Sequence, residues 1–324
     1  MELNLPILHL LENSQNILIA GAGGGFDIYA GLPIYFTLKA MGKRVHLANY
    51  SFTPLQLATV LGDPIVEIKD VLVGARGKVK RNFDYYPEGF LAEWFSQQGE
   101  DEIIWMIDGS GVPLVQQAYQ RLIRKLKIDA IILVDGGVDS LMRGDEAHPG
   151  TLLEDTISLA AIEPFDVPVK VLASVGFGTE VEEDVCHYTA LENMAALIKA
   201  GAFYGSCALT PQMDAFKQYE SACRHAWEGE NRRKSHISTR IIPAVHGEFG
   251  DVHMYENDGH YTSRVFVSPL MGLYWFFDAD VVVKQSLLAN QIRNEATKND
   301  ALLIALNYMS PDRTRKRPRR QIPY

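Results

Sequence analysis

Short apolar runs alternate with amphipathic segments along the first two thirds of the chain, and this alternation constrains the fold more than any other feature. Runs of this kind, bounded by turn residues, are typical of buried strands in parallel sheets. Most end at or next to Gly, Asp or Asn, and the five are Asn16–Ala20, Arg44–Asn49, Glu102–Ile107, Ala130–Val134 and Val167–Ser174. The sequence therefore predicts five buried strands.

Segments with helical spacing lie between or after these runs, at Ala30–Met41, Pro113–Leu126, Thr151–Ala161 and Glu192–Ala200. Thr151 and Glu154 match the pattern of a capping box at the start of the third helix. Parallel strands joined by helices require right-handed crossovers. We therefore expect an α/β fold with a doubly wound, mostly parallel, Rossmann-like sheet and C-terminal α/β additions.

The length of 324 residues suits one large α/β domain with additions. We expect a ligand-binding core over residues 1–205, a C-terminal extension packed on it over 206–311, and a basic tail over 312–324. Two regions interrupt the alternation. Residues 74–101, rich in basic and aromatic side chains, are predicted to be a surface excursion with a small helix, with a lid or subunit contact as the alternative.

The second interruption, residues 229–264, is polar and has few helix signals. Within it, His246, Glu248, Asp251, His253, Glu256, Asp258 and His260 crowd one segment. We expect a solvated loop here, with a Zn²⁺ or Mn²⁺ site as the alternative. Ala279–Ala289 and Asp300–Met309 are predicted to close the fold.

Charge is segregated along the chain. The net charge is -9, but residues 312–324 hold six basic residues and one acidic residue, which leaves 25 basic and 39 acidic residues elsewhere. An acidic body argues against a nucleic-acid-binding surface, except through the tail. The tail is expected to be solvated, with nucleic acid, an anionic membrane, an acidic partner or a second subunit of a homo-oligomer as alternative contacts.

The N-terminal segment, the apolar runs and the cysteines indicate the cellular compartment. No apolar run reaches the ~18 residues that a transmembrane helix needs, so no membrane partner is expected. Leu5–Leu11 lacks the basic flank and cleavage site of a signal peptide. Cys186, Cys207 and Cys223 include no Cys-x-x-Cys pair, which favours reduced thiols in a cytoplasmic protein. A nucleophilic Cys186 beside His187 is the alternative.

The first predicted strand ends in a glycine-rich loop, Gly21-Ala22-Gly23-Gly24-Gly25-Phe26-Asp27. Glycines let backbone N–H groups approach a ligand, and the start of the next helix favours an anion. Phe26 stands where the dinucleotide fingerprint needs a glycine, and Asn49 replaces the ribose-binding carboxylate. A standard nicotinamide-dinucleotide dehydrogenase is thus disfavoured. The expected ligand-binding residues are Gly21, Gly23, Gly24, Gly25 and Asp27.

Carboxylates and glycines also follow the fourth and fifth predicted strands, in Asp135–Ser140, Asp145-Glu146 and Gly176–Glu180. Several carboxylates at one strand end repel one another unless a cation or a hydroxyl-bearing ligand binds them. Mg²⁺ held by Asp139 and Asp145 is one solution. We predict ligand binding by Asp135, Gly136, Gly137, Gly176 and Gly178, and catalytic roles for Asp139, Asp145, Glu146 and Glu180. Glu146 or Glu180 is the expected general base.

These loops carry two resemblances. Gly21–Asp27 with Gly31 and Pro33, followed by Val134–Ser140, Arg143, Asp145-Glu146 and Asp155, resembles the DUF1152 family of uncharacterised bacterial and archaeal proteins over roughly residues 15–200. The resemblance implies a Rossmann-like fold and a site at these loops, and no reaction. Gly21-Ala22-Gly23 with Gly31-Leu32-Pro33 is also similar to a sirtuin loop, although no zinc-binding cysteine pairs accompany it.

The sequence contains neither a Walker A loop nor a Gly-x-Ser-x-Gly elbow. Together, the loops predict an enzyme that acts on a nucleotide or another phosphorylated or sugar-bearing metabolite, by hydrolysis or glycosidic cleavage, with Mg²⁺ as the candidate cofactor. The alternatives are a nucleotide-binding sensor or assembly module without turnover, a structural partner-binding module, and a sirtuin-like enzyme that consumes NAD⁺.

Overall fold

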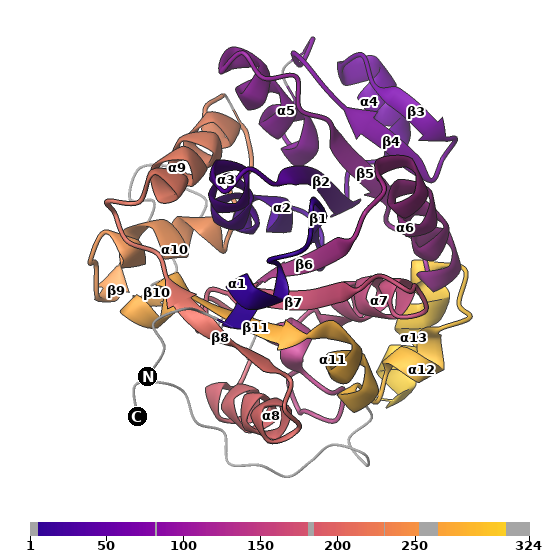
Figure 1. Cartoon of the computed structure of the whole chain (residues 1–324), viewed down its shortest axis with the longest axis vertical. Coiled ribbons are helices and arrows are strands. Elements are labelled where there is room, and N and C mark those ends of the chain that lie inside the picture. Colours follow the sequence, from indigo (N-terminus) through magenta and orange to yellow (C-terminus); the bar gives the residue numbers. More distant parts are fainter. Residues whose placement is uncertain (1–5, 82, 181–184, 230, 253–264, 309–324) are drawn as a thin grey trace.

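Figure 1 shows the computed structural model, which describes residues 6–81, 83–180, 185–229, 231–252 and 265–308. Within these residues, one nine-stranded sheet has the order β3-β4-β5-β2-β1-β6-β7-β11-β8. Its strands are β1 (Asn16–Gly21), β2 (Arg44–Ser51), β3 (Ile65–Ile68), β4 (Leu72–Ala75), β5 (Ile104–Asp108), β6 (Ala130–Gly136), β7 (Val169–Val175), β8 (Phe203–Ala208) and β11 (Leu273–Asp278). A separate hairpin pairs β9 (Gly250–Val252) with β10 (Val265–Val267).

The five predicted strands form the parallel centre of the sheet, in the order β5-β2-β1-β6-β7. The remaining strands pair antiparallel and extend both edges, with β3 and β4 beside β5 and with β11 and β8 beside β7. The predicted α/β fold with a mostly parallel sheet is therefore confirmed. The predicted boundary at residue 205 lies inside β8, which belongs to this same sheet.

Side chains of the central strands alternate between two cores, as the period of a strand requires. Ile17 and Ile19 of β1 enter one core, and Leu18 and Ala20 enter the other. The first core is covered by α1 (Pro6–Leu10), α2 (Asp27–Ala30), α3 (Leu32–Ala40), α4 (Leu55–Leu61), α5 (Pro87–Gln97), α9 (Asp214–Trp227) and α10 (Ser238–Val245). The second is covered by α6 (Val112–Leu126), α7 (Leu152–Ile162), α8 (His187–Lys199), α11 (Ala279–Gln285), α12 (Ala289–Ile292) and α13 (Lys298–Tyr308). Figure 1 shows the sheet between these two layers, with α3 and α9 on the left and α6, α7 and α13 on the right.

The chain passes from β1 to its neighbour β2 on one side of β1, and later returns to place β6 on the other side of β1. In doubly wound sheets, ligands bind outside the carboxyl ends of the strands at this reversal. The register pairs Gly21 with Val134. The loops that follow β1 and β6 therefore emerge side by side, which is where the glycines and carboxylates were predicted to meet.

Two local predictions are wrong. Thr151 makes no side-chain capping bond at the start of α7, because its hydroxyl donates to Asp139 Oδ2 instead. Residues 74–101 do contain a helix, α5, and residues such as Lys80 and Arg81 before it are exposed, but the helix itself does not lie on the surface. Phe90 and Phe95 are fully buried in the first core, since α9 covers α5. None of the helices in the described part of the chain has both the length and the apolar character needed to cross a bilayer.

Candidate functional site

Asp27 joins the loops that follow β1 and β6. The chain turns at Gly24 and Gly25, whose φ angles of 95° and 60° favour glycine, and it enters α2 at Asp27. Asp27 Oδ2 accepts the backbone N–H of Gly23 at 2.7 Å, and Oδ1 accepts that of Gly136 at 3.4 Å. The carboxylate is thus held between two strand-end loops.

Asp135 and Asp155 complete a group of three carboxylates with Asp27. Asp135 lies near the end of β6, and its Oδ2 accepts the backbone N–H and the hydroxyl of Ser140. Asp155 lies in the first turn of α7 and is 1% exposed. Its Oδ1 is buried and has no hydrogen-bond partner among the residues that the structure describes. One oxygen from each of Asp27, Asp135 and Asp155 lies within 4.8 Å of the others.

The three carboxylates are costly to keep ionised together. Burial, followed by the negative charge of Asp139, raises the pKa of Asp27 from 3.8 to about 8. Burial and the neighbouring aspartates raise the pKa of Asp135 and of Asp155 well above 3.8. A cation would remove this repulsion and would satisfy the unpaired oxygen of Asp155. Because all the donors are carboxylate oxygens, the group fits a hard divalent ion such as Mg²⁺ or Mn²⁺.

Gly23 leaves the space between two of these carboxylates open. A Cβ atom at Gly23 would lie 2.7 Å from Asp155 Oδ2 and 2.8 Å from Asp27 Oδ2. Glycine is therefore required at this position by space, and its φ angle is not in the left-handed region.

Asp139 lies next to this group but has its own partners. Its Oδ2 accepts the backbone N–H of Thr151 at 2.7 Å and the Thr151 hydroxyl at 2.9 Å, and its carboxyl group is hydrogen-bonded to Glu180. Glu180 Oε2 accepts the backbone N–H of Val138 at 2.6 Å, and its carboxylate fills the space beside Gly137. Both acidic residues are buried, and burial raises the pKa of Asp139. The structure thus brings Asp139 and Glu180 together, as a second layer beside the three-carboxylate group.

The other predicted acids lie in the turn after η1 (Asp139–Leu141). Glu146 Oε1 accepts the backbone N–H of Arg143 and the side-chain amide of Asn193, while Oε2 accepts the N–H of Gly144. These bonds tie the turn to α8. Asp145 lies in the same turn and is half-buried. The metal-ligating pair predicted from the sequence, Asp139 and Asp145, is not part of the group of three.

The glycines after β7 support the second layer. Gly176 and Gly178 have φ angles of 96° and 95°. The side chain of Thr179 lies against Gly176, and the ring of His187 lies against Gly178. His187 also packs on Phe177, and burial lowers its pKa to about 4, so its imidazole is neutral near pH 7. Cys186 and Cys223 are buried, Cys207 is half-buried, and none of the three is in a disulfide.

The glycine loop after β1 offers backbone N–H donors beside the three carboxylates. Among the described contacts, none gives an acceptor to the N–H groups of Gly24, Gly25 and Phe26. The ring of Phe52, which follows β2, lies against Gly24 and Gly25 and is 45% exposed. The hydroxyl of Tyr85 lies against Gly25 on the same loop. The loop therefore presents free N–H groups between two aromatic side chains.

Asn49, at the end of β2, faces inward. Its side-chain amide donates to the carbonyl of Gly25 and to Glu88 Oε1, both at 2.8 Å, and it is completely buried. Gly21 lies directly against it, because a Cβ atom there would overlap Asn49 Oδ1. Asn49 thus holds the glycine loop on α5.

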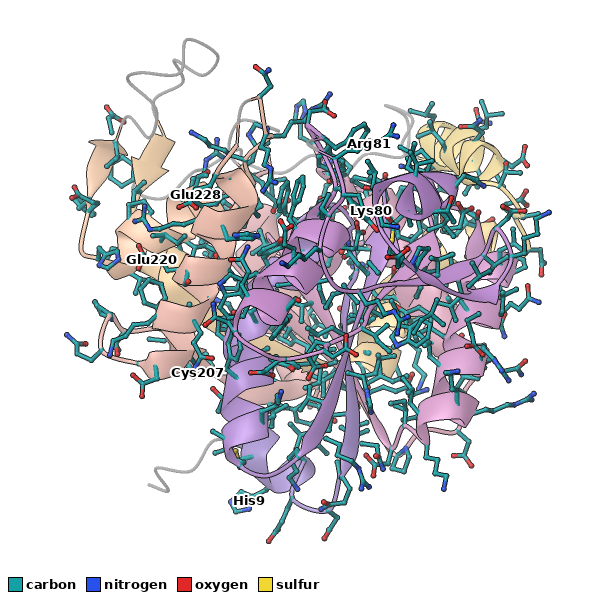
Figure 2. All side chains as sticks on the ribbon, turned by 90° about the horizontal axis from the view of Figure 1, so that it is seen from above. His9, Lys80, Arg81, Cys207, Glu220 and Glu228 are labelled. Carbon is teal, nitrogen blue, oxygen red and sulfur yellow. The ribbon has the colours of Figure 1, made fainter. Side chains whose placement is uncertain are left out.

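The His- and acid-rich segment lies elsewhere. His246 Nε2 pairs with Glu220 Oε2 at 2.9 Å. Figure 2 shows Glu220, on α9, and Glu228, directly after it, away from Lys80 and Arg81. Asp251 is an exposed residue of β9. His253, Glu256, Asp258 and His260 lie outside the described residues, as does the basic tail over 312–324.

Three residues at the site were not predicted as site residues: Asp155, Phe52 and Lys298, which pairs with Glu154. Asp155 lies in a helix, and the prediction considered strand ends. The sequence position of Asp155 could have indicated this role, because a helix that follows a strand-end loop directs its first turn back toward that strand end.

Comparison with known proteins identifies a family and nothing closer. The sequence profile of "Protein of unknown function (DUF1152)" matches residues 91–309, about two thirds of the chain. No curated protein and no solved structure matches. The matched residues include the loops after β6 and β7 and the start of α7, and they begin after the glycine loop. The chain therefore belongs to the DUF1152 family.

Proposed function

We propose that this chain is a divalent-cation-dependent hydrolase that acts on a nucleotide or another phosphorylated or sugar-bearing metabolite. One observation carries the proposal. One oxygen from each of Asp27, Asp135 and Asp155 lies within 4.8 Å of the other two where the sheet reverses its strand order, and Asp155 Oδ1 is buried with no donor among the described residues. Without a cation, this arrangement costs free energy that the hydrogen bonds from Gly23, Gly136 and Ser140 offset only in part.

The residues have separable roles. Asp27, Asp135 and Asp155 would hold the ion, which would polarise the scissile group and lower the pKa of a bound water. The N–H groups of Gly24, Gly25 and Phe26 would hold an anionic group of the substrate, as glycine loops before a helix commonly do.

Glu180 is the better candidate for the base that accepts a proton from the attacking water. It lies in the second layer beside Gly137 and Asp139. Glu146, the other candidate, has both of its oxygens bonded to the turn that contains it and to Asn193. Its role in the proposal is to hold that turn.

Metal binding is the first test. Titration calorimetry with Mn²⁺ and with Mg²⁺ should show one ion bound per chain. Asp155→Asn should weaken binding at least tenfold, because it removes the charge that the ion neutralises. Asp166→Asn, which changes an exposed acid beyond the end of α7, is the matched control and should leave the affinity unchanged. Equal affinities in the wild type and Asp155→Asn would refute the site.

Turnover is the second test. The protein should be incubated with a panel of nucleotides and sugar phosphates, with Mg²⁺ or with EDTA, and the products identified by mass spectrometry. The proposal expects hydrolysis of at least one compound that EDTA and Asp155→Asn both abolish. A nucleotide that binds but stays intact with Mg²⁺ would favour the sensor without turnover. Release of nicotinamide from NAD⁺ would favour the sirtuin-like alternative.

A further inference from the structure

Lys298, which is distant in sequence from the strand-end loops, lies next to the candidate site, where it contacts Glu154 and Phe52. We propose that Lys298 binds the phosphate group of the substrate. In the absence of substrate, Glu154 pairs with this lysine, and the phosphate then replaces the Glu154 carboxylate as its partner. The inference rests on the proposed function and narrows its substrate class to phosphorylated compounds. Lys298 thereby becomes a specificity-determining residue contributed by α13.

The ammonium group of Lys298 contacts two residues that adjoin the site, Glu154 and Phe52. Its Nζ pairs with Oε1 of Glu154, which precedes Asp155 in the first turn of α7. The same Nζ lies 4.9 Å from the ring centroid of Phe52. The Phe52 ring lies against Gly24, and the Asp155 carboxylate lies against Gly23. Lys298 therefore contacts the ring beside Gly24 and the residue that precedes the carboxylate beside Gly23.

Lys298 can exchange Glu154 for another anion. The side chain of Lys298 is 34% exposed and that of Glu154 is 12% exposed. A partly exposed pair of this kind contributes little to stability, so a better anion can replace the carboxylate at little cost. A phosphate held by the free N–H groups of Gly24 to Phe26 would be such an anion, because lysine binds phosphate as a strong point charge.

Two nearby arginines do not serve this purpose. Arg143 donates to the carbonyl of Gln285, and Arg240 is buried and donates to the carbonyl of Thr179. Both guanidinium groups hold backbone segments near the strand ends. Lys298 differs from these arginines because its partner is the carboxylate of Glu154 and not a backbone carbonyl. The charge of that carboxylate adds to the negative charge of the neighbouring aspartates. Glu154 adds to the repulsion that raises the pKa of Asp27.

The test uses inorganic phosphate as the probe, with the full chain and a fixed Mg²⁺ concentration. Calorimetry should give a phosphate affinity that falls at least tenfold in Lys298→Ala. Glu154→Gln should have the opposite effect and tighten phosphate binding, because it releases the lysine. Lys284→Ala, which removes an exposed lysine of the neighbouring helix α11, is the matched control and should not change the affinity.

The double variant Lys298→Ala/Glu154→Gln separates release of the lysine from simple loss of a repelling charge. If Glu154 acts through Lys298, the double variant should bind phosphate no better than Lys298→Ala alone. A double variant that keeps the full gain of Glu154→Gln would overturn the inference. A lysine that merely attaches α13 to α7 would lower the melting temperature in both single variants without changing phosphate affinity, which would also overturn it.

Mn²⁺ titration of the same samples keeps the two proposals apart. Wild-type protein that binds Mn²⁺ but not phosphate would overturn the role of Lys298 and leave the metal-dependent function standing. Protein that binds phosphate through Lys298 but no metal would retain the phosphate subsite and refute the metal-dependent hydrolase.

Discussion

Asp27 and Gly136 are joined across the carboxyl ends of β1 and β6, where Asp27 Oδ1 accepts the Gly136 N–H at 3.4 Å. The other oxygen of Asp27 accepts the Gly23 N–H at 2.7 Å, so one carboxyl group holds both strand-end loops. These bonds favour the ionised form, but burial and the charge of Asp139 outweigh them and raise the pKa to about 8. Asp27 therefore keeps its proton near neutral pH until a cation displaces it.

The first prediction concerns the pH dependence of stability. A carboxyl group with a pKa near 8 in the folded state and 3.8 as its ordinary value contributes stability that is fully present below pH 3.8. This contribution is lost as pH rises through 8, by up to about 1.4 kcal/mol per pH unit for a single group. In EDTA, the free energy of unfolding measured by urea denaturation should fall between pH 5 and pH 8.

Two conditions should flatten this dependence. Asp27→Asn removes one titrating group, and saturating Mg²⁺ stabilises the ionised carboxylates in the folded state. The raised pKa values of Asp135 and Asp155 leave part of the slope in the variant. Stability in EDTA that stays level or rises from pH 5 to pH 8 would contradict the buried, repelling carboxylates.

A second prediction concerns the space at Gly23. Gly23→Ala would place a methyl group 2.7 Å from Asp155 Oδ2 and 2.8 Å from Asp27 Oδ2, so the carboxylates must move apart. We expect Mn²⁺ affinity to fall at least tenfold, measured by calorimetry, while the chain still folds. Gly62→Ala is the control, since its methyl group would meet only ordinary contacts at 3.6 Å and beyond. Equal Mn²⁺ affinity in Gly23→Ala and the wild type would place the ion elsewhere.

The sequence pattern predicted the centre of the sheet better than its edges. Alternation of apolar runs and helices identified β1, β2, β5, β6 and β7, because a strand buried on both faces and followed by a crossover leaves that signal. β11 was not identified as a strand. It pairs antiparallel with β7, and an apolar run carries no signal for the direction of its pairing.

At the site, the strand pattern predicted which loops meet, but the sequence did not predict the contacts that individual side chains make there. The loops after β1 and β6 were predicted to converge, and the bond between Asp27 and Gly136 shows that they do. The capping box failed because Asp139, twelve residues earlier, accepts the hydroxyl of Thr151. Lys298 could not be found from sequence, since only the packing of α13 beside α7 brings it to Glu154.

A third prediction concerns Asn49, whose amide donates to the Gly25 carbonyl and to Glu88 Oε1. Asn49→Asp would replace that donor with an acceptor, facing a carbonyl and a carboxyl group in a fully buried place. We expect a loss of roughly 2–4 kcal/mol in the free energy of unfolding, from the unsatisfied groups and the buried charge.

Asn290→Asp is the control for Asn49→Asp. It makes the same chemical change at an exposed residue of α12 and should alter stability by less than about 0.5 kcal/mol. If Asn49→Asp were as stable as the wild type and gained affinity for NAD⁺, this position would be a ribose site and not a clamp on the glycine loop.

The fourth prediction separates the two acids first considered as general bases. Glu146→Gln leaves one oxygen to serve three donors, the backbone N–H groups of Arg143 and Gly144 and the amide of Asn193. One donor must then face the new NH₂ group. The free energy of unfolding should fall by about 1–3 kcal/mol, with little change in kcat on whichever substrate the panel identifies.

Glu180→Gln should show the reverse pattern. Its remaining oxygen can still accept the Val138 N–H, and its NH₂ group can donate to Asp139, so the melting temperature should change little. Loss of the base should lower kcat by roughly 10²-fold or more. Thermal denaturation and steady-state kinetics on both variants decide the assignment. A large loss of kcat in Glu146→Gln at unchanged stability would transfer the catalytic role to Glu146, because a residue that only holds the turn cannot reduce kcat without also weakening the fold around it.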